Sequence, residues 1–542
     1  MLYLTALLLA LFLTMPLIPL LRSAAARLGA VDVPCDRKEH CRPMARTGGL
    51  AIAVGACLPA LLWAPPSSFL GGVLGGASIV LLFGFLDDVK NLGHRVKFAG
   101  QITAALVVVL YGGVRIESLG AFLPDAAVLP ALVAVPLTVV VIVGVTNAIN
   151  LADGLDGLAG GIVALSLGCV AYLAYQAGDP VVALLAAGTV GAILGFLRFN
   201  TYPANIFMGD AGSQFLGFVA VTLSLHLTQG APSLSPILPL LLLGLPVLDT
   251  LTVMAGRVRS GRSPFRAGRD HLHHRLRSLG FSHRETVVAA YVFQSALITA
   301  AYFFQSASDL VLAAGYATGC GALLYLLRRA EGTGWSMERS TTAYRALKTA
   351  LDRIRDRGLL VKGAFRAVEL GLPAFFLVSW FMPSTIPREY GYFAAGLMVL
   401  VLLGGLTRPS WGRWSLRLAV YLTIPAVIYL CETQAGEWVS ADAWRVYNLA
   451  LALLVALMIV VVKFSRRDAF RSSPMDFLVL FLAVVVPNFF GGPHWMGVVA
   501  TKIVALFFGY EVLLAELRGQ LGWVGATTLT FLGVAVVRGL WM

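Results

Sequence analysis

Four short clusters of polar residues in the sequence could carry phosphate chemistry. The first is a pair of adjacent carboxylates, Asp87 and Asp88, followed by the cations Lys90 and Lys97. Carboxylates bind a hard cation such as Mg²⁺ or accept a proton, and nearby cations neutralise phosphate oxygens. The pair therefore fits a magnesium-dependent phosphate site, although charges at the edge of an apolar segment would give the same pattern.

The second cluster is the segment NAINLADGLDG at 147–157, which contains Asn147, Asn150, Asp153 and Asp156. These side chains recur every three residues, so on a helix neighbouring members share one face. The glycines between them allow turns and close approach of the backbone to a ligand. A purely structural role would explain the glycines but not four polar side chains in an apolar segment. We therefore favour a functional site.

The third cluster, NTYPANIFMGDAGS at 200–213, begins with Asn200 and places Asp210 in a glycine-flanked turn before an apolar segment. A carboxylate in such a turn could be a metal ligand or a nucleophile. A helix cap is the structural alternative, but Ser213 suits that role better than Asp210 does.

The fourth cluster is RDHLHHR at 269–275, within a long basic segment. Its histidines could bind zinc, but a catalytic zinc site usually needs three correctly spaced ligands and an open position. The arginines on both sides suit an anionic phosphate better, with the histidines donating hydrogen bonds and orienting the ligand. A structural polar loop is the remaining alternative.

The elements that must position these clusters are membrane helices. The chain has 542 residues, of which 58% are hydrophobic and 13% charged, and its mean hydropathy is +0.81. A soluble domain carries about 25% charged residues, and apolar runs near the ~20 residues that span a bilayer recur along this chain. This excludes a soluble enzyme, a disordered protein and a small disulfide scaffold. We predict an all-α polytopic transmembrane protein.

The apolar runs predict about 11 helices in a first domain, residues 1–330. Their expected ranges are 2–21, 47–65, 68–86, 98–112, 128–148, 157–176, 180–198, 213–230, 235–256, 287–304 and 308–327. A basic amphipathic segment at 331–366 follows, either on the inner leaflet or as a solvated linker. About seven further apolar runs predict a C-terminal membrane domain at 367–542, whose role the sequence does not indicate.

The basic residues indicate the orientation. The formal net charge is +13, and counting the helices alternately places every strongly basic loop on one face. Because Lys and Arg gather in cytoplasmic loops, that face is predicted to be cytoplasmic, and all four clusters lie on it. No nucleic-acid motif accompanies the charge, so we predict no nucleic-acid partner.

Together, the four clusters resemble the polyprenyl-phosphate N-acetylhexosamine-1-phosphate transferases of glycosyltransferase family 4. The segments VDVP at 31–34 and RKEH at 37–40 add to the resemblance, which covers roughly residues 1–330. It implies ten or eleven helices around a cleft that faces the cytoplasm of a bacterial inner membrane. It also implies Mg²⁺ (with Mn²⁺ as an alternative), a UDP-amino sugar and undecaprenyl phosphate as substrates, and UMP as a product. A homodimer is left open.

The resemblance also implies roles for individual residues. Asp87 is similar to the base that deprotonates the lipid phosphate, with Asp88 beside it. Asp210 is similar to a magnesium-ligating aspartate, which Asp153 or Asp156 would assist from the nucleotide side. The remaining candidates are expected to bind substrate: Lys97, Asn147, Asn150, Asn200, Arg269, His271, His273 and His274.

The pattern HxHH resembles the branch that initiates cell-surface polysaccharides such as O-antigen, whereas the peptidoglycan branch carries three consecutive histidines. We therefore expect transfer of N-acetylglucosamine 1-phosphate from its UDP donor. One alternative is a phospho-N-acetylmuramoyl-pentapeptide transferase. Another is a non-enzymatic lipid flippase or transporter, because polar groups on broken helices also mark transport sites.

Overall fold

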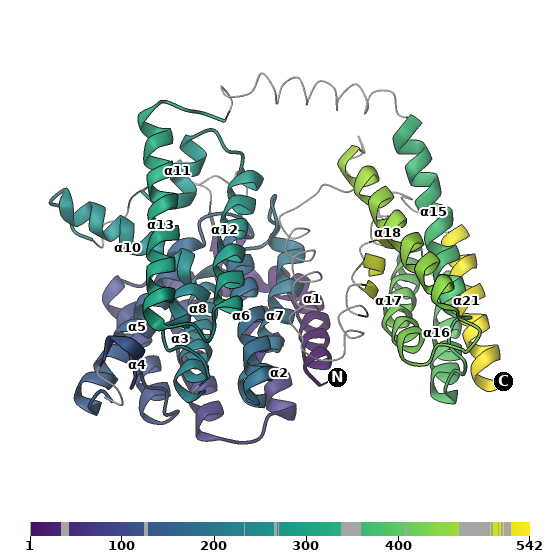
Figure 1. Ribbon diagram of the computed structural model, residues 1–542, viewed down its shortest axis with the longest axis horizontal. Coiled ribbons are helices and arrows are strands. Elements are labelled where there is room, and N and C mark those ends of the chain that lie inside the picture. Colours follow the sequence, from purple (N-terminus) through teal and green to yellow (C-terminus); the bar gives the residue numbers. More distant parts are fainter. Residues whose placement is uncertain are drawn as a thin grey trace. The chain divides into compact units, whose positions relative to one another are not determined.

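The computed structural model describes residues 2–33, 43–123, 128–231, 233–264, 268, 270–337, 359–406, 409–464 and 522–541, with single residues between 499 and 513. These residues are mainly helical (Figure 1), and twelve of their helices are long and apolar enough to cross a membrane. The predicted all-α polytopic fold is confirmed. The chain divides into two compact units, with described residues up to Met337 in the first and from Leu359 in the second.

The first unit is a helical bundle with one short antiparallel ladder, in which β1 (Val31–Asp32) pairs with β2 (Met44–Ala45). A single 3-10 turn, η1 (Gly120–Phe122), precedes α5. Its α-helices are α1 (Leu2–Leu28), α2 (Gly48–Trp63), α3 (Ser68–Lys90), α4 (His94–Leu110), α5 (Ala131–Ala152), α6 (Leu158–Ala177), α7 (Pro180–Asn200), α8 (Gly209–Gly230), α9 (Leu238–Leu242), α10 (Gly244–Arg259), α11 (Leu272–Ser278), α12 (His283–Phe303) and α13 (Asp309–Gly332).

Most helices match their predicted ranges, and three differ where the site lies. Helix α4 begins at His94, so Lys97 belongs to its first turn, and α5 continues to Ala152. Helix α8 begins at Gly209, so Asp210 lies in its first turn and not in a turn before the helix. Gly209 has a φ of +70°, which a residue without a Cβ atom adopts readily, and the chain can turn directly into the helix there.

The prediction of one continuous helix at 235–256 is wrong, because the helix breaks at Leu243 into α9 and α10. Gln294 of α12 stabilises the break from both sides. Its Nε2 donates to the Leu242 carbonyl at 2.8 Å, and its Oε1 accepts from the Leu245 amide at 3.1 Å. A broken helix at membrane depth needs such partners for its freed backbone groups. Beyond the break, α10 projects outward from the other helices (Figure 1).

The core of the first unit is built around α6, α7 and α8, which are almost entirely buried. Helix α8 packs against α2, α3, α5 and α6. Glycines allow two of these approaches, because a Cβ atom on Gly49 of α2 would lie 2.3 Å from the Gly212 nitrogen. A Cβ atom on Gly84 of α3 would lie 2.6 Å from the Ala211 Cα. The backbones of α2 and α3 therefore touch the first turns of α8.

The chain reverses at one end of the bundle between α3 and α4, between α5 and α6, and between α7 and α8. The segment before α8 is tied to the segment before α2. The Phe207 amide donates to the Ala45 carbonyl at 2.9 Å, and the Gly48 amide donates to the Phe207 carbonyl at 3.0 Å. The first three polar clusters lie at these reversals, so the fold gathers them at one end.

The second unit has its own apolar core, which includes Phe376, Trp380 and Phe531. A buried ion pair joins Lys502 Nζ to Glu432 Oε1 at 2.5 Å. Much of the predicted 331–366 segment lies outside the described residues. The described α-helices of the second unit are α15 (Leu359–Ser379), α16 (Arg388–Leu406), α17 (Pro409–Thr433), α18 (Ala441–Phe464) and α21 (Gly522–Leu540).

The contact between α2 and α8 predicts a stability effect. Gly49→Ala should destabilise the protein by about 1–3 kcal/mol, because the new methyl group meets the Gly212 backbone and not a mobile side chain. The thermal midpoint Tm of the purified protein in detergent measures this. Gly144→Ala in α5 is the matched control, since no atom lies within 4 Å of its added Cβ. Equal Tm values for the two variants would contradict the close contact.

Candidate active site

Two of the predicted carboxylates share one lysine. Lys97 Nζ, from the first turn of α4, donates to Asp87 Oδ2 at 2.9 Å and also bonds Asp210 Oδ2. Asp87 lies near the end of α3, and Asp210 lies in the first turn of α8. The ammonium group thus bridges the carboxylates of Asp87 and Asp210, two residues that are 123 positions apart in the chain. Such an arrangement can hold a cation and an anionic phosphate in one place.

Asp88 has a different environment from that of its neighbour. Its Oδ1 accepts from the Asp210 amide at 2.9 Å, and its Oδ2 accepts from the Ala211 amide at 3.0 Å. Only 4% of the residue is exposed. The carboxylate therefore occupies the N-terminus of α8, where unpaired amides and the helix dipole favour a negative charge. Through these two hydrogen bonds Asp88 fixes the backbone of Asp210 and Ala211.

The amide side chains of the second cluster contact the helices around them. Asn150 Oδ1 accepts from the Ser213 hydroxyl at 2.7 Å, which joins the last turns of α5 to α8. Asn147 exchanges hydrogen bonds with Gln101 of α4, and its Nδ2 donates to Gln101 Oε1 at 2.6 Å. Both asparagines lie beside the carboxylate group, and each already has a protein partner.

Asn200 and Asp156 hold the backbone of the turns next to the site. Asn200 Oδ1 accepts from the Gly157 amide at 2.9 Å, and its Nδ2 donates to the Ile206 carbonyl at 2.9 Å. Asp156 Oδ2 accepts from the Ala204 amide at 2.9 Å. Asn200 is buried, with 3% of its surface exposed. These bonds fix the 153–157 turn against the segment that leads into α8.

Asp153 follows the last residue of α5 and faces a strongly negative environment. Burial, together with the charges of Asp210, Asp156 and Asp88, raises the pKa of its carboxyl group to about 7. A carboxyl group with this pKa gives up its proton readily once a cation arrives. The turn therefore has a surplus of negative charge.

The histidine cluster is held by a carboxylate that the sequence analysis did not single out. Asp249 of α10 accepts from the Leu272 amide at 2.7 Å through Oδ1, and its Oδ2 lies 2.9 Å from His271 Nδ1. Asp249 thereby anchors the start of α11 and orients the His271 ring. Arg269, the remaining predicted residue of this loop besides His273 and His274, lies outside the described residues.

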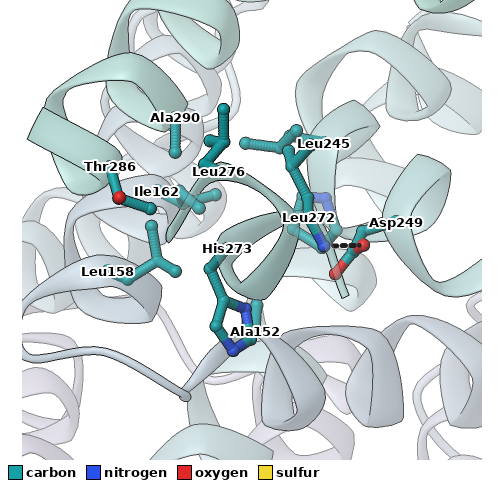
Figure 2. Close-up of a pocket in the computed structure, with 11 residues that line it drawn as sticks. Ala152, Leu158, Ile162, Leu245, Asp249, Leu272, His273, Leu276, Thr286 and Ala290 are labelled. Carbon is teal, nitrogen blue, oxygen red and sulfur yellow. Dashed lines mark hydrogen bonds between the residues drawn. The ribbon is translucent and has the colours of Figure 1, made fainter. Parts of the chain in front are cut away.

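His273 extends from α11 toward Ala152, beside a cavity of about 20 Å³ (Figure 2). A Cβ atom on Gly154 would lie 2.4 Å from His273 Nε2, so the imidazole packs directly on the aspartate turn. Burial, with a smaller effect of the neighbouring His274, lowers the pKa of His273 to about 4. His273 is therefore neutral at physiological pH. The His273 and His274 ring centroids are 4.2 Å apart.

The structure brings most of the predicted residues close together, and their roles stay predictions. Within the part of the chain that is described, no three His, Cys, Asp or Glu side chains already form a metal-ligand group. Sequence reasoning missed Gln101, Gln214 and Asp249. Each is a costly polar residue within an apolar segment, and that cost is the signal that could have identified it.

The family model for glycosyl transferase family 4 matches residues 70–228 of this chain, which include Asp87, Lys97 and Asp210. The chain is 38% identical over 277 residues to a probable undecaprenyl-phosphate N-acetylglucosaminyl 1-phosphate transferase of Bacillus subtilis, covering 51% of this chain and 77% of that protein.

Two further relatives carry related names. A decaprenyl-phosphate N-acetylglucosaminephosphotransferase of Mycobacterium tuberculosis is 34% identical over 368 residues, 60% of this chain and 89% of the relative. The undecaprenyl-phosphate alpha-N-acetylglucosaminyl 1-phosphate transferase of Escherichia coli K12 is 29% identical over 275 residues, which cover 49% of this chain and 74% of that protein. These three matches cover between 49% and 60% of this chain. By the family model and by the extent of these matches, the chain belongs to glycosyltransferase family 4.

Proposed function

We propose that the protein transfers N-acetylglucosamine 1-phosphate from UDP-N-acetylglucosamine to undecaprenyl phosphate. The observation that carries this proposal is the Lys97 ammonium group between Asp87 and Asp210, at one end of a membrane helix bundle. The names of the relatives favour N-acetylglucosamine over the muramoyl-pentapeptide donor and over a flippase. The product would start a cell-surface polysaccharide.

In this reaction an oxygen of the lipid phosphate attacks the β-phosphorus of the UDP-sugar. The bond from that phosphorus to the bridging oxygen breaks, and UMP leaves. Asp87 would accept the proton of the lipid phosphate, while Lys97 neutralises phosphate oxygens. Bringing two anions together makes positioning and charge neutralisation the main sources of catalysis.

The donor set at the site fits a magnesium ion. Carboxylate oxygens are the ligands that Mg²⁺ prefers. The negative charge around Asp153 would repel the phosphates of the donor and of the lipid unless a divalent cation offsets it. Asp210 and Asp153 would hold the ion, which supplies charge neutralisation when bound. Asp156 would act from the adjoining turn. The basic loops support a site that faces the cytoplasm of the inner membrane.

The test is a product analysis. The purified full-length protein is incubated with undecaprenyl phosphate, Mg²⁺ and a panel of UDP-sugars, and the lipids are identified by mass spectrometry. We expect undecaprenyl diphosphate N-acetylglucosamine with an equal amount of UMP. A lipid product from the muramoyl-pentapeptide donor alone would favour the alternative transferase, and no product from any UDP-sugar would overturn the proposal.

The surplus negative charge predicts a pH-dependent stability. The pKa of Asp153 is about 7 in the folded protein and about 4 when unfolded, so the folded state binds more protons between these values. The contribution of Asp153 to the free energy of unfolding therefore decreases as the pH rises from about 4 toward 7. With EDTA present, Asp153→Asn should raise Tm relative to wild type, by an amount that grows from pH 5 to pH 7 and then levels off.

The exposed carboxylate Asp442 of α18 gives the control variant, Asp442→Asn, whose Tm should follow wild type at every pH. Added Mg²⁺ should stabilise wild type more than Asp153→Asn. A Tm gain for Asp153→Asn that does not change with pH would contradict the titration.

Asp210→Asn should nearly abolish turnover while the protein stays folded, because an amide is a poorer ligand than a carboxylate for a hard cation. UMP release measures turnover, and electron paramagnetic resonance of Mn²⁺ measures cation binding directly. Both should be lost together, with Tm close to that of wild type. Unchanged turnover with an unchanged magnesium requirement would remove Asp210 from the proposed site.

The neutral state of His273 predicts a modest effect on donor binding. A hydrogen bond from a neutral imidazole contributes about 0.5–1.5 kcal/mol, so His273→Ala should raise the KM for the UDP-sugar about 2- to 13-fold, equally at pH 6 and pH 8. His226→Ala, near the far end of α8, is the control and should leave this KM unchanged. An increase well above 100-fold that disappears as the pH rises would mean that His273 binds phosphate as a cation.

A further inference from the structure

Two glutamines lie almost fully buried between the helices that carry the acidic residues. Gln101 of α4 has 2% of its surface exposed, and Gln214 of α8 has 1%. An amide in the interior of a membrane bundle is costly unless each of its polar atoms has a partner. The partners of these two side chains therefore indicate why they are there.

The two glutamines form a chain of hydrogen bonds that ends on the proposed metal ligand. Gln101 Nε2 donates to Gln214 Oε1 at 2.9 Å. Gln214 Nε2 in turn faces Asp210 Oδ2 at 3.4 Å, the same oxygen that Lys97 contacts. Gln214 lies one helical turn after Asp210, so its side chain reaches that carboxylate along one face of α8.

The far end of the chain is anchored on α5. Asn147 Nδ2 donates to Gln101 Oε1 at 2.6 Å and to the Val143 carbonyl at 2.9 Å. Because the Val143 carbonyl can only accept, the Asn147 amide group must point its nitrogen at it. That orientation presents a donor to Gln101, which must then present its own donor to Gln214. The bonds from Asn147 Nδ2 through Gln101 to Gln214 and Asp210 thus all run from α5 toward Asp210, beside one longer return bond from Gln101 Nε2 to Asn147 Oδ1 at 3.3 Å.

We propose that Gln101 and Gln214 are positioning residues that hold the Asp210 carboxylate in the orientation that receives the cation, and that Asn147 acts through them and not on the substrate. This inference rests on the proposed function, since it takes Asp210 to be a cation ligand. A donor aimed at Oδ2 fixes the rotation of the carboxylate, and a ligand held in one orientation loses less entropy when the ion arrives.

The simpler explanation is that the amides only join α4, α5 and α8. Apolar side chains of the same shape could do that equally well, because replacing paired buried polar groups by apolar ones can be nearly neutral. If the glutamines only joined the helices, replacing them would change the stability of the protein but not its affinity for a cation. Cation affinity therefore separates the two explanations.

The test compares Gln214→Met and Gln101→Met with Gln229→Met as the matched control. Gln229 lies on the same helix α8 and also joins it to another segment, since its Oε1 accepts from the Ser118 amide at 3.0 Å, but it lies at the other end of α8. Mn²⁺ affinity is measured by electron paramagnetic resonance on the full-length protein without substrate. Tm and the Mg²⁺ concentration for half-maximal UMP release are measured alongside.

We expect Gln214→Met to weaken Mn²⁺ binding about 10-fold or more, because it removes a hydrogen bond to a charged group, and Gln101→Met to weaken it about threefold. Gln229→Met should bind Mn²⁺ as wild type does. The double variant Gln101→Met/Gln214→Met should bind no more weakly than Gln214→Met alone, because Gln101 acts through Gln214.

Wild-type Mn²⁺ affinity in both single variants, whatever their Tm, would overturn this inference while the cation site stands. The same holds if Gln229→Met weakens binding as much as Gln214→Met does. Should Gln214→Met fail to fold, Gln101→Met decides the question, because its side chain does not touch Asp210. No Mn²⁺ binding by the wild type would instead refute the proposed cation site, and this inference with it.

Discussion

The first turn of α8 is the point on which the rest of the site depends. Its amides are bound by the Asp88 carboxylate, and Asp210 projects from the same turn toward Lys97. A buried carboxylate is stable in a membrane protein only with donors or cations around it. The helix terminus supplies donors to Asp88, and Lys97 supplies a cation to Asp87 and Asp210. Moving this turn would remove the amide donors of Asp88 and separate Asp210 from Lys97.

Close packing keeps that turn in place. Gly49 of α2 and Gly84 of α3 let the neighbouring backbones touch Gly212 and Ala211, leaving no room for a side chain between them. Small residues at such crossings are the main means by which helices associate in lipid, where the hydrophobic effect does not drive them together. The first turn of α8 is therefore positioned by backbone-to-backbone contacts, which deform less than contacts between long side chains.

Much of this arrangement could be predicted from sequence, because a polar residue in a long apolar segment is rare and costly. The clusters at 87–97, 147–157 and 200–213 were identified for that reason, and hydropathy placed most of the helices.

Sequence could not separate Asp87 from Asp88, because adjacent residues on a helix point about 100° apart and only the packing of α8 decides which one it meets. Gln101 and Gln214 were overlooked because the bond between them joins α4 to α8, and the sequence does not show which helices meet. The break at Leu243 was missed for a similar reason, since Gln294 stabilises it from 49 positions beyond Leu245.

The histidine cluster and the aspartate turn behave as one unit. His273 lies against Gly154, where no side chain would fit, and Asp249 fixes the helix on which His273 is carried. A displacement of α11 therefore presses on the turn that contains Asp153 and Asp156, and a change in that turn moves His273. In a phosphotransferase the donor diphosphate must reach both the cation and the loop that orients it. Since these two parts already touch, a donor and a cation bound as proposed would meet at one surface, and the binding of each should strengthen the binding of the other.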